Sequence, residues 1–289
     1  MKKALSTLAA SVLVGLAGGN AHAAPRLELL VPAYFYPAGS GSNYWQALDA
    51  AAGQVAVTAI VNVNSGPGDA LDPNYLAAVE SLRAAGGRVL GYVHTSWGGR
   101  DSAVEQADVD AYLARYPLDG FFIDEMATDA ANLAHYTSLY AYIKGKGAGL
   151  TVLGNPGTPA DPAYLGAPAA DILISFEGYA ADYAQLPAGY FDPAFAGRLA
   201  SIVHGASAAQ MEAFIADAAP LGLAMIYVTD DTMPNPYDVL PGYWQQEVDR
   251  AAAVPAPGSL ALAGAGALAW LAGDRKSTRL NSSHGKLSR

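Results

Sequence analysis

Short apolar runs recur along the chain at regular intervals, and a polar turn and a stretch with helical spacing follow most of them. The runs are rich in β-branched and aromatic residues and are bounded by Gly, Pro, Asn or Asp, which is the pattern of buried β-strands. We predict eight strands, at residues 28–34, 57–63, 88–94, 120–124, 150–155, 172–177, 199–204 and 225–229.

The stretches between these strands are rich in Ala and Leu, with the apolar spacing of helices, most clearly at 74–85, 106–116, 131–144 and 208–219. Pro73 and Gly86-Gly87 at the two ends of the first are typical helix start and stop residues. Eight strand–helix units in about 230 residues predict an α/β fold, a single (β/α)8 barrel of the TIM type.

A doubly wound open sheet is the structural alternative. Neither GxGxxG nor GxxxxGK[ST] follows any predicted strand, so nothing in the chain favours nucleotide binding. HExxH and EF-hand spacings are also missing from the sequence, and the two histidines at strand ends, His94 and His204, belong to the third and seventh strands. We therefore expect neither a cofactor nor a metal ion.

The first 23 residues have the features of a signal peptide. Lys2 and Lys3 precede an apolar run at 4–18, and Ala21-His22-Ala23 has the small residues that signal peptidase requires. A membrane anchor is the alternative, but the run is shorter than the roughly 20 residues of a membrane span. We predict that the domain at 24–253 is exported to the periplasm, the outer cell surface or the extracellular space.

Two further segments follow the predicted domain. In 254–275, the sequence VPAPGS precedes an apolar run at 260–272 and then Asp274, Arg275 and Lys276. This order resembles the bacterial PEP-CTERM sorting signal, with Ala256 where that motif has Glu, and the resemblance implies transient membrane contact in an exopolysaccharide-producing, biofilm-forming bacterium. Residues 276–289 begin KSTRLNSSH, which resembles translated adapter sequence, so we predict a non-native, disordered tail.

Composition and charge exclude several classes of function. The chain has no cysteine, which excludes thiol catalysis, Cys-ligated zinc and disulfide scaffolding. Seven of the 16 basic residues lie at the two ends, so residues 24–253 carry 9 basic and 25 acidic side chains, a net charge of −16. Such a body repels phosphate backbones, and we expect no nucleic-acid partner. It would attract a cationic polymer, although exported proteins are also acidic simply to remain soluble.

In a barrel of this type the active site lies at the C-terminal ends of the strands. Acidic residues dominate those positions, and a carboxylate that follows an apolar strand is costly to bury unless it is hydrogen-bonded or functional. The catalytic candidates are Asp124, Glu125 and Glu177. The substrate-binding candidates are Tyr34, Tyr36, Asn62, His94, Asn155, Tyr179, Tyr227 and Asp230.

Each candidate also has an ordinary structural interpretation. Asp124 could cap the following segment, and in a regular strand Asp124 and Glu125 would point to opposite faces. Glu177 could be an exposed loop acid, yet Phe176 and Tyr179 flank it and would raise its pKa by desolvation. The histidines could be hydrogen-bonding partners and the tyrosines packing residues. Aromatic rings beside carboxylates are nevertheless typical of sugar-binding sites.

Seven motifs occur in the order found in spherulin-4 domains, and the chain resembles a bacterial member of that spherulation-specific family. The motifs are PAYFYP at 32–37, NVNSGPG at 62–68, GYVHT at 91–95, DGFFIDE at 119–125, GNPGT at 154–158, FE at 176–177 and YVTD at 227–230. The resemblance implies a barrel fold and an activity like that of glycoside hydrolase family 135, which cleaves α-1,4-linked N-acetylgalactosamine in galactosaminogalactan.

The family's acids correspond to Asp124, Glu125 and Glu177, and all three are retained. The resemblance therefore implies a secreted hydrolase whose substrate is a galactosamine-containing exopolysaccharide, and which is endo-acting and retaining. By analogy with retaining α-galactosidase barrels, Asp124 would be the nucleophile and Glu177 the acid/base, with Glu125 orienting the sugar or exchanging roles. A non-catalytic barrel that binds matrix polysaccharide is the alternative, and we expect a monomer.

Overall fold

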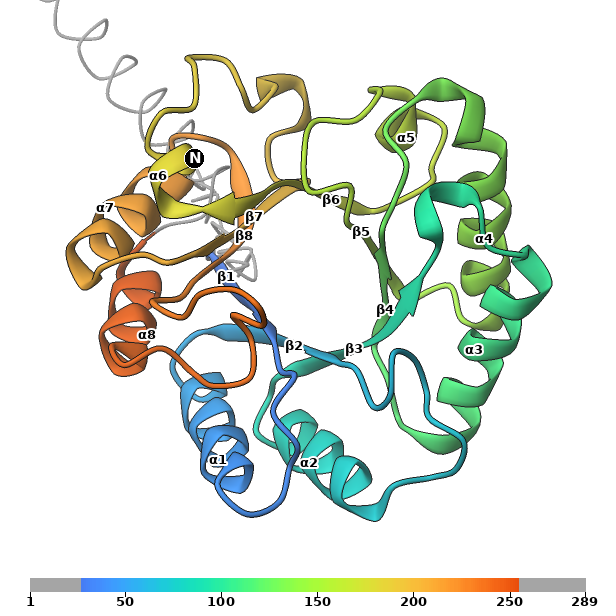
Figure 1. Ribbon diagram of the computed structural model, residues 1–289, viewed down its shortest axis with the longest axis horizontal. Coiled ribbons are helices and arrows are strands. Elements are labelled where there is room, and N and C mark those ends of the chain that lie inside the picture. Colours follow the sequence, from blue (N-terminus) through green and yellow to red (C-terminus); the bar gives the residue numbers. More distant parts are fainter. Residues whose placement is uncertain (1–26, 255–289) are drawn as a thin grey trace, which may run out of the picture.

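The computed structural model describes residues 27–254 and contains one closed barrel of eight parallel strands in the order β1 to β8 (Figure 1). Each strand pairs with the next along the chain, and β8 pairs with β1. The strands are β1 Glu28–Pro32, β2 Ala56–Val61, β3 Arg88–His94, β4 Gly120–Asp124, β5 Thr151–Gly154, β6 Ile172–Tyr179, β7 Leu199–His204 and β8 Leu223–Val228.

Helices surround the barrel on its outer side (Figure 1). The longer ones are α1 Gly41–Ala52, α2 Pro73–Ala84, α3 Ser102–Arg115, α4 Leu133–Lys146, α7 Ala208–Ala218 and α8 Trp244–Ala253. Short turns of helix occupy α5 Ala163–Gly166, α6 Ala180–Tyr183, η1 Ser96–Gly98, η2 Ala130–Asn132 and η3 Pro193–Phe195. The predicted (β/α)8 barrel is confirmed.

Sequence chemistry at the helix ends accounts for several boundaries. The Asp72 carboxylate accepts hydrogen bonds from the first free N–H groups of α2, and Pro73 stands at the first helical position, where no N–H is needed. Ser207 and Gln210 form a reciprocal capping box at the start of α7. These local signals begin each helix at a defined distance from the preceding strand end.

The core has two apolar layers, one inside the barrel and one between the strands and the helices. Each longer helix buries one face against the strands, for example Val79 and Leu82 of α2 and Met211 and Ile215 of α7. All six residues of β7 are buried, as expected for a parallel strand covered on both faces. The barrel is thus a packed scaffold with its polar groups at its two ends.

The predicted terminal segments fall almost wholly outside the described residues. The signal peptide at 1–23 and the tail at 276–289 lie beyond residues 27–254, as does the PEP-CTERM-like segment apart from Val254. No helix between residues 27 and 254 has the length and hydrophobicity that a membrane span requires.

Candidate active site

The first carboxylate of the site is placed by the end of β4. Phe121, Phe122 and Ile123 are buried, and the strand then ends at Asp124 on the C-terminal mouth of the barrel. Glu125 has a left-handed backbone with φ 52°, so the pleat ends between the two acids. The alternation that would separate them in a regular strand therefore no longer applies.

Asn155 connects Asp124 to the second carboxylate. It follows β5, between the strands that carry Asp124 and Glu177, and is almost fully buried. Its side-chain Nδ2 donates to Asp124 Oδ1 at 2.8 Å and to Glu177 Oε2 at 2.6 Å. Because both oxygens bond to one nitrogen, at 2.8 and 2.6 Å, they lie at most 5.4 Å apart, which is compatible with the roughly 5 Å of a retaining glycosidase pair.

Two tyrosine hydroxyls occupy the remaining carboxylate oxygens. Tyr92 of β3 donates to Asp124 Oδ2 at 2.8 Å, and Tyr237, in the loop after β8, donates to Glu177 Oε1 at 2.6 Å. Tyr34 lies between these two rings, with edge-to-face contacts at 6.1 and 5.7 Å. Neutral donors therefore hold both acids, and their side chains cannot turn away without losing hydrogen bonds.

Burial raises the pKa of both carboxyl groups. For Glu177, desolvation is opposed by hydrogen bonds from Tyr237 and Asn155 and reinforced by the charge of Asp124. For Asp124, desolvation is opposed by hydrogen bonds from Tyr92, the Glu125 backbone and Asn155. Burial and the nearby carboxylates also raise the pKa of the tyrosines Tyr34, Tyr92 and Tyr237, so all three hydroxyls stay protonated, and those of Tyr92 and Tyr237 donate to the acids. Two acids with raised pKa values in one mouth are suited to proton transfer.

Glu125 is held by the loop after β3 and not by Asn155. Its Oε2 accepts a hydrogen bond from the backbone N–H of Ser96 at 3.1 Å, and its carbonyl accepts from Trp97 at 2.7 Å. Thr95 Oγ1 donates to the carbonyls of Asp124 and Glu125. The third acid therefore lies at the β3 side of the pair.

Three other predicted site residues use their polar groups to shape the rim. Asn62 Oδ1 accepts from Gly66 N, and Asp230 accepts from Gly242 N with both carboxylate oxygens. The Tyr36 hydroxyl donates to Asp72 at the start of α2. These side chains hold the loops after β2, β8 and β1, and none contacts the acid pair.

His94 and Tyr179 lie nearer to the acids along their strands. His94 is the last residue of β3 and pairs in register with Asp124, and its ring lies 6.4 Å from that of Tyr92. Tyr179 is the last residue of β6, two positions after Glu177, and 46% of its surface is exposed. Its ring packs edge-on against His204, which is buried.

Tyr227 is fully buried, so the structure gives it no exposed surface for contact with a ligand. The register pairs it with Ile202, which in turn pairs with Glu177, so Tyr227 lies on the same inward face of the sheet as Glu177. The sequence Leu223–Val228 is apolar on both faces, so no polar alternation indicates which residues face the barrel interior. Tyr227 therefore packs on the inner face of the barrel wall.

Tyr92 and Tyr237 are the site residues that the sequence did not single out. Tyr92 shares its strand face with His94, two positions on, so alternation from His94 was a usable signal. No signal in the sequence indicated Tyr237, because it lies in a proline-rich loop 60 residues from its partner Glu177.

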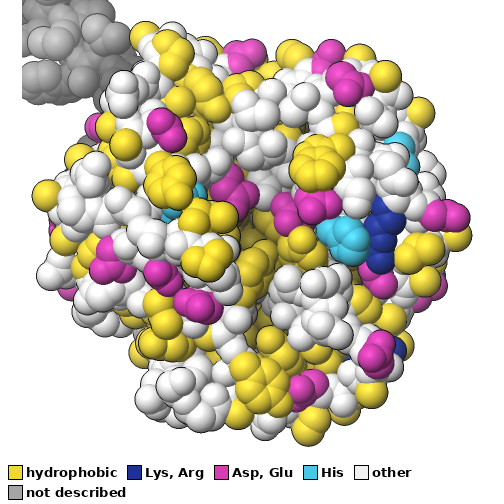
Figure 2. Space-filling model, in the orientation of Figure 1, with side chains coloured by type: hydrophobic (Ala, Val, Ile, Leu, Met, Phe, Trp, Pro, Cys, Tyr) yellow, Lys and Arg dark blue, Asp and Glu magenta, His cyan; other side chains and the backbone are white. Residues whose placement is uncertain are grey.

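The acids lie beside a hollow at the centre of the molecule. Figure 2 shows acidic side chains around this hollow, with hydrophobic side chains beside them on the surrounding rim. Within residues 27–254, no group of three or more His, Asp or Glu side chains has an arrangement that could hold a metal ion. The hollow thus offers paired carboxylates and aromatic rings as its chemistry.

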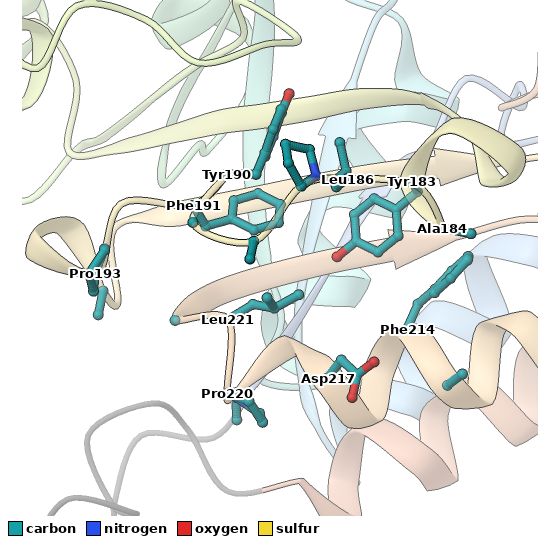
Figure 3. A pocket seen from close by; sticks show the side chains of 17 residues that line it. Tyr183, Ala184, Leu186, Tyr190, Phe191, Pro193, Phe214, Asp217, Pro220 and Leu221 are labelled. Carbon is teal, nitrogen blue, oxygen red and sulfur yellow. The ribbon is translucent and has the colours of Figure 1, made fainter.

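A separate apolar pocket of about 600 Å³ lies outside the barrel, between the segment after α6, helix α7 and the turn before β8 (Figure 3). Its lining includes Tyr183, Tyr190, Phe191, Phe214 and Leu221, and Asp217 is its acidic side chain. None of the predicted site residues lines it. With a single carboxylate, this pocket lacks the pair that the mouth provides.

Known proteins resemble the chain in sequence and in fold. Residues 28–251 match the family described as Spherulation-specific family 4. Spherulin-4 of Physarum polycephalum is 33% identical over 231 residues, which cover 76% of this chain and 69% of the relative.

Among solved structures, Sph3 from Aspergillus clavatus in complex with GalNAc superposes with a TM-score of 0.67 at 24% identity, covering 79% of this chain and 98% of Sph3. A cyclic maltosyl-maltose hydrolase from Arthrobacter globiformis superposes with a TM-score of 0.50 at 12% identity, covering 79% and 80% of the two chains. At these identities the structures establish a shared barrel fold, while the sequence matches establish that the chain belongs to spherulation-specific family 4.

Proposed function

We propose that this protein is a glycoside hydrolase that cleaves polymers of α-1,4-linked galactosamine or N-acetylgalactosamine. It cuts internal bonds of the polymer and retains the anomeric configuration. The observation that carries the proposal is the amide of Asn155, which donates to the carboxylates of both Asp124 and Glu177 and so keeps these two acids together. The GalNAc complex of Sph3 supports the sugar class, since Sph3 has the same fold over 79% of this chain.

Asp124 is assigned as the nucleophile because three groups hydrogen-bond to its ionised form: Tyr92, Asn155 and the backbone of Glu125. Its oxygen attacks the anomeric carbon and forms a glycosyl ester, and the bond to the leaving oxygen breaks. This role requires Asp124 to be ionised, which its hydrogen bonds favour against the cost of burial.

Glu177 is assigned as the acid/base because burial and the charge of Asp124 both favour its protonated form. It donates its proton to the leaving oxygen in the first step. In the second step, ionised Glu177 takes a proton from water while that water attacks the ester and releases Asp124. Glu125 is assigned to orienting the sugar from the β3 side, where Ser96 holds it.

The remaining parts of the proposal concern location and substrate charge. A signal peptide at 1–23 would export the protein, and a sorting segment at 254–275 would retain it transiently at a membrane. The net charge of −16 on residues 24–253 supports a partly deacetylated, cationic polymer as the substrate.

The test incubates the purified full-length protein with α-1,4-linked galactosamine polymers of varied acetylation and with neutral glucans, and detects new reducing ends by mass spectrometry. Oligomers released from the amino-sugar polymer, and lost with Asp124→Asn, are the expected result. Cleavage by Asp124→Asn at the unsubstituted rate would refute the assignment of the nucleophile. Retention of polymer without any cleavage would instead identify a binding barrel.

A further inference from the structure

Trp97, in the loop after β3, is the most exposed of the large hydrophobic side chains among residues 27–254. Its surface is 65% exposed, more than that of Tyr36, Met233 or Tyr179. Exposing an indole ring to water has no stability benefit, because Trp contributes to folding chiefly through buried surface. A largely exposed Trp at the mouth of a barrel therefore indicates contact with a ligand.

The backbone around Trp97 is strained, which makes its exposure harder to explain by folding alone. Ser96 and Trp97 have φ values of 48° and 54°, in the left-handed region that non-glycine residues rarely occupy. Glu125, with φ 52°, has the same conformation, and Trp97 N donates to its carbonyl at 2.7 Å. Strained residues that persist beside an active site are typical of positions held for function.

These contacts place Trp97 beside the first acid of the pair. The loop that carries it is tied to the end of β4 through Thr95 N, which donates to the Asp124 carbonyl, and through Ser96 N, which donates to the Glu125 carboxylate. Trp97 thus lies on the β3 side of the carboxylates, and the position of its backbone is fixed relative to them.

Tyr179 is the exposed aromatic residue on the other side of the pair. It ends β6, two positions after Glu177, and its ring is braced edge-on against His204 with centroids 4.3 Å apart. In a closed barrel of eight strands, β3 and β6 lie on nearly opposite sides of the mouth. One exposed side chain, Trp97, therefore lies on the Asp124 side of the pair, and the other, Tyr179, lies on the Glu177 side.

We propose that Trp97 and Tyr179 are sugar-stacking platforms on the two sides of the acid pair, so that a polymer crosses the mouth from β3 to β6. This inference rests on the proposed function and adds which residues bind the sugars on each side of the cleaved bond. Aromatic faces bind the apolar faces of sugar rings, and two platforms that flank the acids leave space for the chain to continue in both directions. Such a site cuts polymers internally.

The first experiment measures binding without cleavage, using full-length Glu177→Gln and an α-1,4-linked N-acetylgalactosamine polymer in affinity electrophoresis. Adding Trp97→Ala should raise the Kd about 10-fold, a typical loss for one aromatic stacking contact. Trp97→Phe should recover most of that loss. Leu221→Ala, which shortens an exposed apolar side chain at the other end of the barrel, is the matched control and should leave the Kd unchanged.

The second experiment follows hydrolysis of oligomers of increasing length by the otherwise unsubstituted enzyme. The kcat/KM should rise with oligomer length until both platforms are occupied. In Trp97→Ala and in Tyr179→Ala this gain with length should shrink about 10-fold, mainly through KM. Trp97→Gly should have a thermal midpoint no lower than that of the unsubstituted protein, since glycine tolerates the left-handed backbone, whereas a structural role would lower it.

The outcomes separate this inference from the proposed function. If Trp97→Ala cleaves the polymer with the same length dependence as the unsubstituted enzyme, the stacking role is overturned. The proposed hydrolase activity is then unaffected. Weaker polymer binding by the Trp97 variant without cleavage by the unsubstituted enzyme would support the platforms and overturn the hydrolase. If Glu177→Gln binds no polymer and the unsubstituted enzyme cleaves none, both are overturned.

Discussion

The carboxylates at the two ends of the barrel have different partners. At the N-terminal end, Arg88 of β3 pairs with Glu28 of β1 at 2.8 Å and donates to Thr151, while Thr58 donates to the same glutamate. At the C-terminal mouth, Asp124 and Glu177 share a neutral amide donor. Among residues 27–254, no ion pair includes either of them.

This difference distinguishes a carboxylate that stabilises the fold from carboxylates that can exchange protons with a substrate. At the N-terminal end, the guanidinium of Arg88 offsets the charge of Glu28 in a salt bridge. At the mouth, burial and a neighbouring carboxylate raise the pKa of Asp124 and of Glu177. Each acid therefore keeps its proton to a higher pH than a free carboxyl group does. Carboxylates without a cation cost stability but can exchange protons with a substrate.

The largest effect should come from Glu177→Gln. Loss of the proton donor should lower kcat on the order of 10³-fold. Because burial raises the pKa of Glu177 above its usual 4.5, the folded state binds the proton more tightly than the unfolded state does. The unsubstituted protein therefore loses stability as pH rises through and above 4.5, and the glutamine variant should lose less.

Kinetics and thermal unfolding between pH 4 and pH 8 would check both parts of this prediction. The thermal midpoint of Glu177→Gln should equal or exceed that of the unsubstituted protein at neutral pH. A clearly lower midpoint together with the lost activity would mean that Glu177 is a structural carboxylate, and the contrast between the two ends would disappear.

Asn155→Ala should have the next largest effect, because one amide positions both acids. Its hydrogen bonds lower the pKa of Asp124 and of Glu177, so removing them should move both limbs of the kcat/KM profile to higher pH. Misplacement of the pair should lower kcat about 10²-fold. A pH–rate profile is the measurement, and an unshifted profile would show that Asn155 does not control the pair.

Tyr237→Phe should act on one acid only. The hydroxyl of Tyr237 lowers the pKa of Glu177, so its removal should raise that pKa further and move the basic limb of kcat/KM upward. The acidic limb, assigned to Asp124, should stay in place, and kcat should fall about 10-fold. Tyr164→Phe, whose hydroxyl donates to the backbone carbonyl of Asp129 and to neither acid, is the control. Movement of the acidic limb instead would reverse the roles assigned to the two acids.

Glu28→Gln tests the opposite end. It leaves Arg88 without its carboxylate partner, which should lower the free energy of unfolding by about 1–2 kcal/mol, a modest value because the arginine is partly exposed. The kcat should remain unchanged, since the pair lies at the far end of the strands from the acids. Denaturant unfolding and kinetics on the same preparation would check this. A large fall in kcat would show that the two ends are coupled.

The sequence predicted most of the scaffold because its signals are local. The predicted strands 88–94, 120–124 and 199–204 have the same bounds in the structure, since each is an apolar run that ends at a polar residue. Helices α1 and α8 were not singled out. The helix predicted at 106–116 begins four residues earlier, at Ser102, where the Asp101 side chain caps it.

The contacts of the site were less predictable because the fold creates them. Strand ends placed Asp124, Asn155 and Glu177 at the mouth, but the shared amide depends on the barrel closing around β5. Tyr237 reaches Glu177 from a loop with no regular pattern, and Tyr227 is fully buried although it shares the inward face of Glu177. Residue types and strand ends predict which groups meet, and closure of the barrel decides how they are bonded.

The smallest expected effect concerns charge at long range. The mouth acids have no cationic partner, and residues 24–253 carry a net charge of −16, so a cationic polymer should approach faster than a neutral one. Raising the ionic strength from about 0.02 to about 0.5 M shortens the Debye length to a few ångströms and should lower kcat/KM for a partly deacetylated polymer several-fold.

The fully acetylated polymer is the control, because it has no charge for the protein to attract. Its kcat/KM should stay flat over the same salt range, while kcat should stay flat for both polymers, since salt acts on the encounter and not on the buried pair. Equal salt dependence for the two polymers would show that the acidic surface serves solubility alone. A fall in kcat would instead mean that the carboxylates of the mouth are screened by solvent ions and are less isolated than their burial implies.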